Sequence, residues 1–136
     1  MNKIFSADIE QIGQMIEFVL EAARHQGLDG KELNMIRLSL EEALVNVINY
    51  AYPEGDGNVE IIYRLENSKG LVIDIVDTGI PFNPLDKPIP DINLALEERP
   101  IGGMGIYLIR QNMDEVKYKR EHNKNILTLT KYYKTS

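Results

Sequence analysis

Apolar residues recur at intervals of three and four over the first third of the chain, and this spacing predicts two helices. The second helix runs from about Gly30 to Tyr52 and stops before Pro53. Because it carries apolar residues on nearly every side, we expect it to be buried. The first helix ends near Gly27, and its apolar face consists of Ile9, Ile12, Ile16, Val19 and Ala23.

Five further segments have the pattern of strands, and one has the pattern of a third helix. In the strand segments, apolar residues alternate with polar ones or form short continuous runs. Glycines at 102, 103 and 105 open the third helix, which extends from about Met104 to Met113. We expect turns at 54–57 and 67–70, a closing hairpin, and strands at 2–6, 58–65, 71–76, 115–120 and 125–132.

A proline-rich segment separates the third strand from the third helix. All but one of the six prolines lie between residues 81 and 100. Proline has no backbone N–H, so this segment is not a regular helix or central strand throughout, although 92–98 has room for two helical turns. A long irregular stretch in a small domain is typical of a lid, a binding loop or a disordered segment. We predict a lid loop at about 81–101.

The order β-α-α-β-β-loop-α-β-β predicts an α+β fold, in which helices cover one face of a mixed, mainly antiparallel sheet as a two-layer sandwich. A length of 136 residues suits one domain over residues 1–136. The net charge of −6 argues against a nucleic-acid partner. Cysteine is absent, which excludes disulfides and thiolate metal sites. No membrane span or signal peptide is visible, so we expect a cytoplasmic protein without a membrane partner.

Three polar side chains share one side of the second predicted helix. At about 100° per residue, Glu42, Asn46 and Asn49 fall within a stripe about 60° wide. Buried polar groups need partners, and a carboxylate with two amides suits a hydrated cation or a polar substrate. An ordinary solvated helix face is the alternative interpretation. The neighbouring Glu41 points about 100° away and is expected at the surface.

A carboxylate also stands at the end of the apolar strand 71–76, in the sequence Asp77-Thr78-Gly79. A carboxylate only accepts hydrogen bonds, so it suits the exocyclic amine of adenine, and a glycine without Cβ lets a flat ring approach the backbone. A simple turn after a strand has the same signature. The triplet also matches that of aspartic proteases, but one copy would need a homodimer to pair two aspartates.

The glycine-rich segment Gly102-Gly103-Met104-Gly105 precedes the third predicted helix. Closely spaced glycines expose backbone N–H groups at the positive end of a helix dipole, a geometry that binds phosphate. The segment is neither a Walker motif nor a Rossmann fingerprint, because the other residues of those motifs are missing. A flexible hinge that caps the helix is the alternative.

These three motifs, in this order and spacing, resemble the GHKL (Bergerat-fold) ATPase superfamily, whose N box and two glycine boxes they match. Within it, the chain is similar to the anti-sigma-factor serine/threonine kinases of bacterial partner-switching systems, over about Ala7 to Lys131. Neither His25 nor His122 sits in a phosphoacceptor helix, so we expect no complete sensor histidine kinase. The coupling domains of the gyrase, chaperone and mismatch-repair branches are not evident either.

The resemblance implies a role for each matching residue. Glu42 would be the general base that accepts the proton of a serine or threonine hydroxyl, and Asn46 would be the Mg²⁺ ligand. Asn49 would touch phosphate or metal-bound water. Asp77 would bind adenine beside Gly79, and Thr128 of the last strand would support that contact. The resemblance implies that phosphate is bound by Gly102, Gly103, Met104, Gly105 and Ile106. It implies that Arg99 reaches the terminal phosphate or a protein partner.

Two positions depart from the family pattern. Pro81 stands where the first glycine box usually has a second glycine, and it removes one N–H and stiffens the loop. Lys124-Asn125 stands where some relatives have Gly-Thr before the last strand.

The resemblance therefore predicts an ATP- and Mg²⁺-dependent serine/threonine protein kinase that acts as an anti-sigma factor. Its expected partners are a small anti-sigma-factor antagonist as phosphoacceptor, a sigma factor, and a second copy of the chain in a homodimer. The departure at Pro81 leaves a second function open, a nucleotide-responsive module that binds its partner without phosphotransfer. A stand-alone ATPase is a third and weaker hypothesis.

Overall fold

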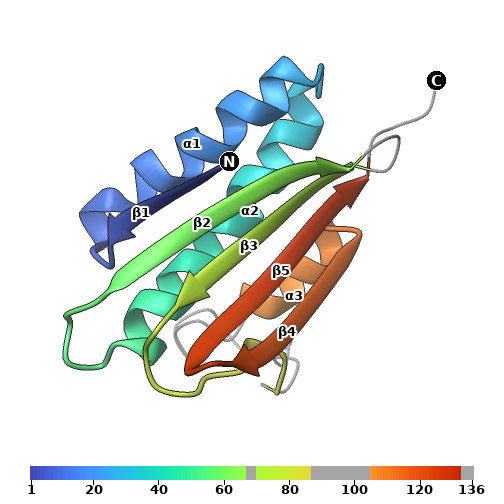
Figure 1. Cartoon of the computed structure of the whole chain (residues 1–136). Coiled ribbons are helices and arrows are strands. Elements are labelled where there is room, and N and C mark those ends of the chain that lie inside the picture. Colours follow the sequence, from blue (N-terminus) through green and yellow to red (C-terminus); the bar gives the residue numbers. More distant parts are fainter. Residues whose placement is uncertain (67–69, 87–104, 133–136) are drawn as a thin grey trace, which may run out of the picture.

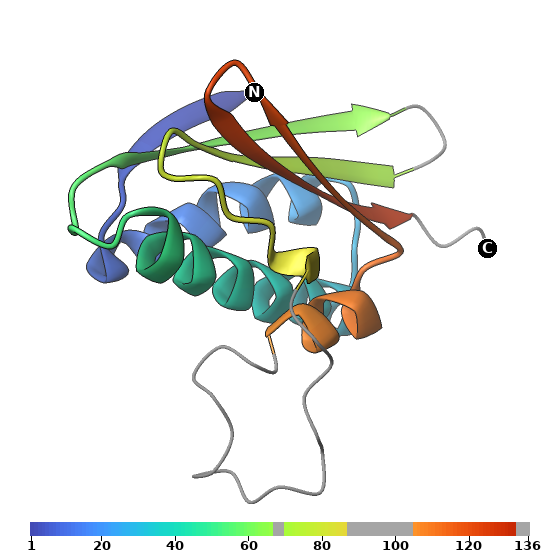
Figure 2. The same cartoon turned by 90° about the horizontal axis from the view of Figure 1, so that it is seen from below.

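The computed structural model describes residues 1–66, 70–86 and 105–132, which form one sheet covered on one face by helices (Figure 1). Five strands lie in the order β1-β2-β3-β5-β4, and all four pairings among them are antiparallel. The three α-helices lie on the same side of this sheet (Figure 2). The predicted α+β two-layer sandwich is confirmed.

The strands follow the predicted segments to within one residue at each end. They are β1 (Asn2–Ser6), β2 (Asn58–Glu66), β3 (Gly70–Asp77), β4 (Glu115–Glu121) and β5 (Lys124–Tyr132). The predicted closing hairpin is β4–β5. Its two turn residues, His122 and Asn123, have φ angles of 53° and 64°. Two successive left-handed residues match the twist of the flanking strands, as in a type I′ hairpin turn.

The helices begin at polar caps that the sequence supplies. Asp8 accepts a hydrogen bond from the backbone of Glu10 at the start of η1 (Ile9–Gln11), which leads into α1 (Ile12–His25). Asp29 accepts one from the Glu32 N–H and caps α2 (Gly30–Asn46). A π-helical turn, η2 (Val47–Ala51), continues α2. The remaining helices are the short η3 (Pro84–Asp86) and α3 (Gly105–Asn112).

The core lies between the helices and the inner face of the sheet. The inner residues of β3 are Leu71, Ile73 and Ile75, each at most 1% exposed, and they face fully buried side chains of all three helices. On the helix side these are Met15, Val19 and Leu20 of α1, Ile36, Leu40 and Leu44 of α2, and Ile109 of α3. Alternation along β3 then places Asp77 on this same inner face, at the end of the apolar run.

The second helix is buried along much of its length, as expected, but not around its whole circumference. Leu38 is 40% exposed, and Glu41 is exposed as expected. One face of the helix covers the sheet and its two flanks contact α1 and α3, so only the side that points away from the sheet meets solvent. No helix in the described part of the chain is both long and apolar enough to span a membrane. The lid predicted at 81–101 lies largely outside the described residues.

Candidate functional site

The polar stripe of α2 contains three residues in three different environments. Asn46 is buried at 3% exposure, Glu42 is half-buried, and Asn49 is exposed. The difference has a geometric cause. Asn49 lies in η2, where i→i+5 bonding puts more residues into each turn, so the side chain no longer follows the α-helical stripe. The stripe is therefore neither a plain solvated face nor a uniformly buried one.

Asn46 has an unsatisfied oxygen. Its Oδ1 is buried and has no hydrogen-bond partner in the described structure. Leaving a buried acceptor unpaired costs about 1–3 kcal/mol, so such an atom in a native protein calls for a partner such as water, an ion or a ligand. An amide oxygen is a hard donor of the kind that Mg²⁺ binds alongside phosphate oxygens and water. The described residues contain no cluster of three or more His, Asp or Glu that would hold a metal without such additional ligands.

Glu42 lies one helical turn before Asn46 and has a perturbed acidity. Burial raises the pKa of the Glu42 carboxyl above its ordinary value of 4.5, and the neighbouring Glu41 carboxylate raises it further. A raised pKa makes a carboxylate a better proton acceptor near neutral pH. The position of Glu42, beside an unpaired ligand atom and open to solvent on one side, suits a general base.

Asp77 is the second buried polar residue of the site. It is 3% exposed, and its Oδ1 accepts hydrogen bonds from the Gly79 backbone N–H at 2.9 Å and from Asn125 Nδ2 at 2.8 Å. Burial raises the pKa of Asp77 above its ordinary value. The two hydrogen bonds and the nearby Arg120 guanidinium oppose that rise. Within the described structure, no hydrogen bond reaches the other oxygen, Oδ2, which leaves an acceptor for a ligand.

The end of η2 and the turn after β3 are in direct contact. The Ile80 N–H donates to the Ala51 carbonyl at 3.0 Å, and the Thr78 N–H donates to the Tyr52 hydroxyl at 2.8 Å. A Cβ built on Gly79 would lie 2.2 Å from the Ala51 oxygen. Glycine is thus required at position 79 for packing against η2, whereas the sequence suggested room for a flat ring. These contacts bring Asp77 to the end of the helix that carries Glu42 and Asn46.

Thr128 is not beside Asp77. The expectation that it supports the adenine contact of Asp77 is therefore wrong in this structure. In the β3–β5 register Thr128 pairs with Asp74, and its hydroxyl donates to Asp74 Oδ1 at 2.6 Å. Both side chains point to the outer face of the sheet, opposite to Asp77. The residue that pairs with Asp77 is Asn125, which is 4% exposed.

Asn125 belongs to the candidate site although none of the three motifs contains it, and the sequence does carry the signal for its position. Leu127 and Leu129 mark the buried face of the last strand, and counting back by two from them places Asn125 inward and Thr128 outward. The departure from the family pattern at Lys124-Asn125 therefore changes a residue that contacts Asp77 directly.

The second glycine segment is described only in part. Gly105 begins α3, and the Ile106 side chain is 3% exposed in the core, so only the backbone N–H groups of these two residues are candidates for phosphate. Helix α3 packs against α2. At its other end, Lys131 Nζ donates to the Asn112 carbonyl at 2.9 Å, a favourable charge for a helix C-terminus. Arg99, Gly102, Gly103 and Met104 lie outside the described residues.

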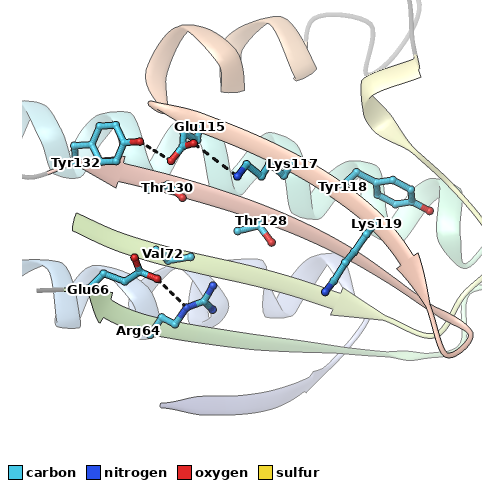
Figure 3. A pocket seen from close by; sticks show the side chains of 10 residues that line it. All are labelled: Arg64, Glu66, Val72, Glu115, Lys117, Tyr118, Lys119, Thr128, Thr130 and Tyr132. Carbon is cyan, nitrogen blue, oxygen red and sulfur yellow. Dashed lines mark hydrogen bonds and ion pairs between the residues drawn. The ribbon is translucent and has the colours of Figure 1, made fainter. Parts of the chain in front are cut away.

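A hollow of about 730 Å³ lies on the opposite face of the sheet (Figure 3). Apart from Tyr118, which bonds Asn125 on the inner face, its side chains stand on the outer face of β2, β3, β4 and β5. Its charged side chains form ion pairs with one another, such as Arg64 with Glu66, or with residues beside the hollow, such as Lys119 with Glu121. It contains no orphaned buried group, so we place the candidate site at Asn46 and Asp77 despite the size of this hollow. Its lining consists of Arg64, Glu66, Val72, Glu115, Lys117, Tyr118, Lys119, Thr128, Thr130 and Tyr132.

Comparison with known proteins agrees with this geometry. The family model described as histidine kinase-like ATPase domain matches residues 5–131. The chain belongs to this ATPase family. Serine-protein kinase RsbW of Bacillus cereus (strain ATCC 10987 / NRS 248) is 30% identical over 114 residues, which cover 81% of this chain and 70% of the relative. RsbW of Bacillus mycoides (strain KBAB4) matches with the same values. These relatives place the chain in the serine-protein kinase branch of the histidine kinase-like ATPase family.

A solved structure supports the fold of this ATPase domain. The histidine kinase domain of the blue-light activated histidine kinase from Erythrobacter litoralis EL346 is similar with a TM-score of 0.51 at 16% identity. The match covers 88% of this chain but only 59% of that one. The likeness concerns the fold alone.

Proposed function

We propose that this chain is an ATP-dependent serine/threonine protein kinase that also acts as an anti-sigma factor. The observation that supports it most directly is the buried, unpartnered Oδ1 of Asn46, one helical turn after Glu42. The same helix ends against the turn that follows Asp77. Two contacting elements therefore carry the three groups that the reaction needs. The helix provides the metal ligand Asn46 and the base Glu42, and the end of β3 provides Asp77 as the acceptor for a purine amine. Membership of the ATPase family and the RsbW relatives agree with this combination.

Each residue then has one task in phosphoryl transfer. Bound Mg²⁺ would neutralise phosphate charge, and the Asn46 oxygen would hold it in place. Glu42 orients the hydroxyl of the incoming serine or threonine and accepts its proton. Its half-buried position keeps it accessible to a protein substrate. Because transfer depends mainly on positioning and charge neutralisation, a base with a modestly raised pKa is sufficient.

Nucleotide binding is assigned to the remaining residues of the motifs. Asp77 would accept the adenine amine on Oδ2, and the N–H groups of Gly105 and Ile106 at the start of α3 would contact phosphate. Asn49 is exposed and turned away from the stripe, so its proposed contact with phosphate or metal-bound water rests on the sequence motif. The roles of Arg99, Gly102, Gly103 and Met104 rest on the sequence motif alone. Gly79 acts indirectly, because it allows the turn after Asp77 to pack on η2.

The proposed partners are those of the partner-switching kinases. The chain would phosphorylate a small anti-sigma-factor antagonist, bind a sigma factor alternately, and form a homodimer in the cytoplasm. No nucleic-acid contact is proposed, because the net charge is −6.

The proposal is tested by phosphate transfer from labelled ATP to the small protein that co-purifies with the chain. We expect transfer by the wild type and a loss of about 10²–10⁴-fold in Glu42→Gln, with ATP binding retained. Glu41→Gln is the matched control, because it removes the adjacent exposed carboxylate. It relieves only the smaller of the two effects on the pKa of Glu42, so it should change transfer far less than Glu42→Gln does. Glu42→Ala serves as the more severe variant. Equal transfer by Glu42→Gln and wild type would remove Glu42 from the mechanism.

A nucleotide-responsive binding module is the second candidate, and Pro81 favours it. Pro81 provides no N–H where the first glycine box usually has glycine. The preceding N–H, that of Ile80, already donates to the Ala51 carbonyl of η2. Such a module would bind ATP and the partner but leave the partner's mass unchanged. Steady phosphate release without any partner would instead indicate a stand-alone ATPase.

A further inference from the structure

Asn125 uses every hydrogen-bonding position of its side chain within the protein. Its Nδ2 donates to Asp77 Oδ1 and to the Ile80 carbonyl, both at 2.8 Å. Its Oδ1 accepts from the Tyr118 hydroxyl at 2.6 Å and from the Phe82 N–H at 3.2 Å. A carboxamide has two N–H donors and two lone pairs, so nothing remains for a ligand. Any effect of Asn125 on a ligand must act through the groups that it holds.

The group that it holds most directly is the Asp77 carboxylate. Both hydrogen bonds to this carboxylate, from Asn125 and from the Gly79 N–H, go to Oδ1. Two donors on one oxygen fix the rotation of the carboxylate and direct Oδ2 away from both. A single free acceptor in a fixed direction distinguishes purines, because adenine presents an amine where guanine presents a carbonyl oxygen.

Two opposing effects act on the pKa of Asp77, and the amide of Asn125 belongs to the one that favours the charged carboxylate. Burial raises the pKa of Asp77, and the Asn125 hydrogen bond is the largest effect that opposes the rise. From β4, the Arg120 guanidinium donates to the Gly79 carbonyl and adds positive charge, and the Tyr118 hydroxyl contacts Asn125. From the end of η2, the Tyr52 hydroxyl contacts Thr78.

We propose that Asn125 is a positioning residue that turns one carboxylate oxygen of Asp77 toward the purine base and thereby makes the site prefer ATP to GTP. This inference rests on the proposed nucleotide site at Asp77. An ionised Asp77 accepts from the adenine amine and repels the guanine carbonyl. A protonated Asp77 donates to the guanine carbonyl, so the preference disappears on protonation. Loss of the Asn125 amide moves that protonation to higher pH.

The test measures binding of Mg·ATP and Mg·GTP by calorimetry between about pH 5 and about pH 8. The wild type should prefer ATP by at least about a hundredfold at neutral pH. Asn125→Leu should reduce the preference by about tenfold or more, and the pH at which the preference is lost should rise. Asn125→Thr retains one hydroxyl donor and should restore most of the preference. Thr130→Val, on the outer face of the same strand, is the control and should match the wild type.

A second variant covers the case in which Asn125→Leu does not fold. Asn125→Asp keeps the shape and faces Asp77 with another carboxylate, so the two share a proton and the pH profile should shift further upward. Thermal unfolding of each variant shows which of them are folded. An unchanged ATP preference and pH profile in folded Asn125→Leu or Asn125→Asp would overturn the inference, as would equal ATP and GTP binding by the wild type. If the wild type binds neither nucleotide, the proposed function itself fails.

Discussion

At the scale of single residues, the candidate site consists of groups that reduce the stability of the fold. The buried Asn46 oxygen has no partner, and burial penalises the charged forms of Glu42 and Asp77. Apolar residues in the same places would pack against the core without these penalties. Such unfavourable groups persist at functional sites because ligand binding or chemistry requires them.

Replacing Glu42 with glutamine should therefore stabilise the protein at neutral pH. The native state raises the pKa of Glu42 above 4.5, so the native state holds this proton more tightly than the unfolded state does. The resulting penalty is absent below about pH 4, grows as the pH rises through the raised pKa, and is complete above it. Urea unfolding should show Glu42→Gln more stable than wild type at about pH 7 and equal to it at about pH 4.

The control for this prediction is Glu21→Gln on the exposed side of α1, which should change the free energy of unfolding by at most about 0.5 kcal/mol. A Glu42→Gln variant that is less stable than wild type at neutral pH would show that ionised Glu42 is stabilised by the native state.

At the scale of elements, the contact between η2 and the turn after β3 brings Asp77 close to the helix that carries Glu42 and Asn46. The helical run predicted to reach Tyr52 was correct in extent, but a π-helical turn replaces its last α-helical turn. This change turns Asn49 to the surface and brings the Ala51 carbonyl to the Ile80 N–H. Local propensity does not predict such a turn, because it depends on what the helix end packs against.

Gly79→Ala should weaken the contact between η2 and the turn after β3. The new Cβ would meet the Ala51 backbone oxygen at 2.2 Å, and a backbone atom cannot move aside as a flexible side chain can. Overpacking of this kind costs about 1–3 kcal/mol, and more where the backbone must shift. Because the shift also displaces Asp77, ATP affinity should fall together with stability. Both are measurable, by urea unfolding and by calorimetry.

Gly13→Ala is the matched control for that substitution. Apart from its chain neighbours and the backbone of its own helix, nothing lies within 4 Å of a Cβ built on Gly13, which is exposed near the start of α1. Alanine is the better helix former, so this variant should gain up to about 1 kcal/mol and bind ATP normally. If both glycine variants were equally stable, the packing role of Gly79 would be excluded.

At the scale of the whole molecule, ligand binding and folding are linked, because α2, β3 and α3 all contribute to the proposed site. The unfolded chain lacks this arrangement, so Mg·ATP should raise the melting temperature as its concentration rises. At a hundredfold excess over the dissociation constant, the gain is about 2.7 kcal/mol. The measurement is thermal unfolding at several concentrations of Mg·ATP, with EDTA as the metal-free comparison.

Asn46→Leu should separate stability from ligand binding in this experiment. Leucine has the same branching as asparagine and removes the unpaired oxygen, so the ligand-free protein should gain about 1 kcal/mol. The stabilisation by Mg·ATP should be reduced to that of ATP with EDTA. An Asn46→Leu variant that Mg·ATP stabilises as strongly as wild type would exclude Asn46 as the metal ligand.

The amino-acid sequence by itself determined the elements, their order and three residues of the candidate site. Periods of 3.6 and 2 in apolar residues predict helices and strands because each pattern buries one face, and the order of elements implies a sheet with helices on one side. Glu42, Asn46 and Asp77 were evident because polar residues are unusual in such apolar segments. Nothing in that pattern depends on contacts between distant segments.

Only the tertiary structure decided which residues meet at the site. The pairing of Asp77 with Asn125 and of Asp74 with Thr128 follows from the β3–β5 register, which joins residues 48 or more positions apart along the chain. A shift by a single residue would exchange the two faces of the strand and bring Thr128 inward. The register is set by the burial of Leu127 and Leu129 against the helices, an energy that belongs to the folded chain as a whole.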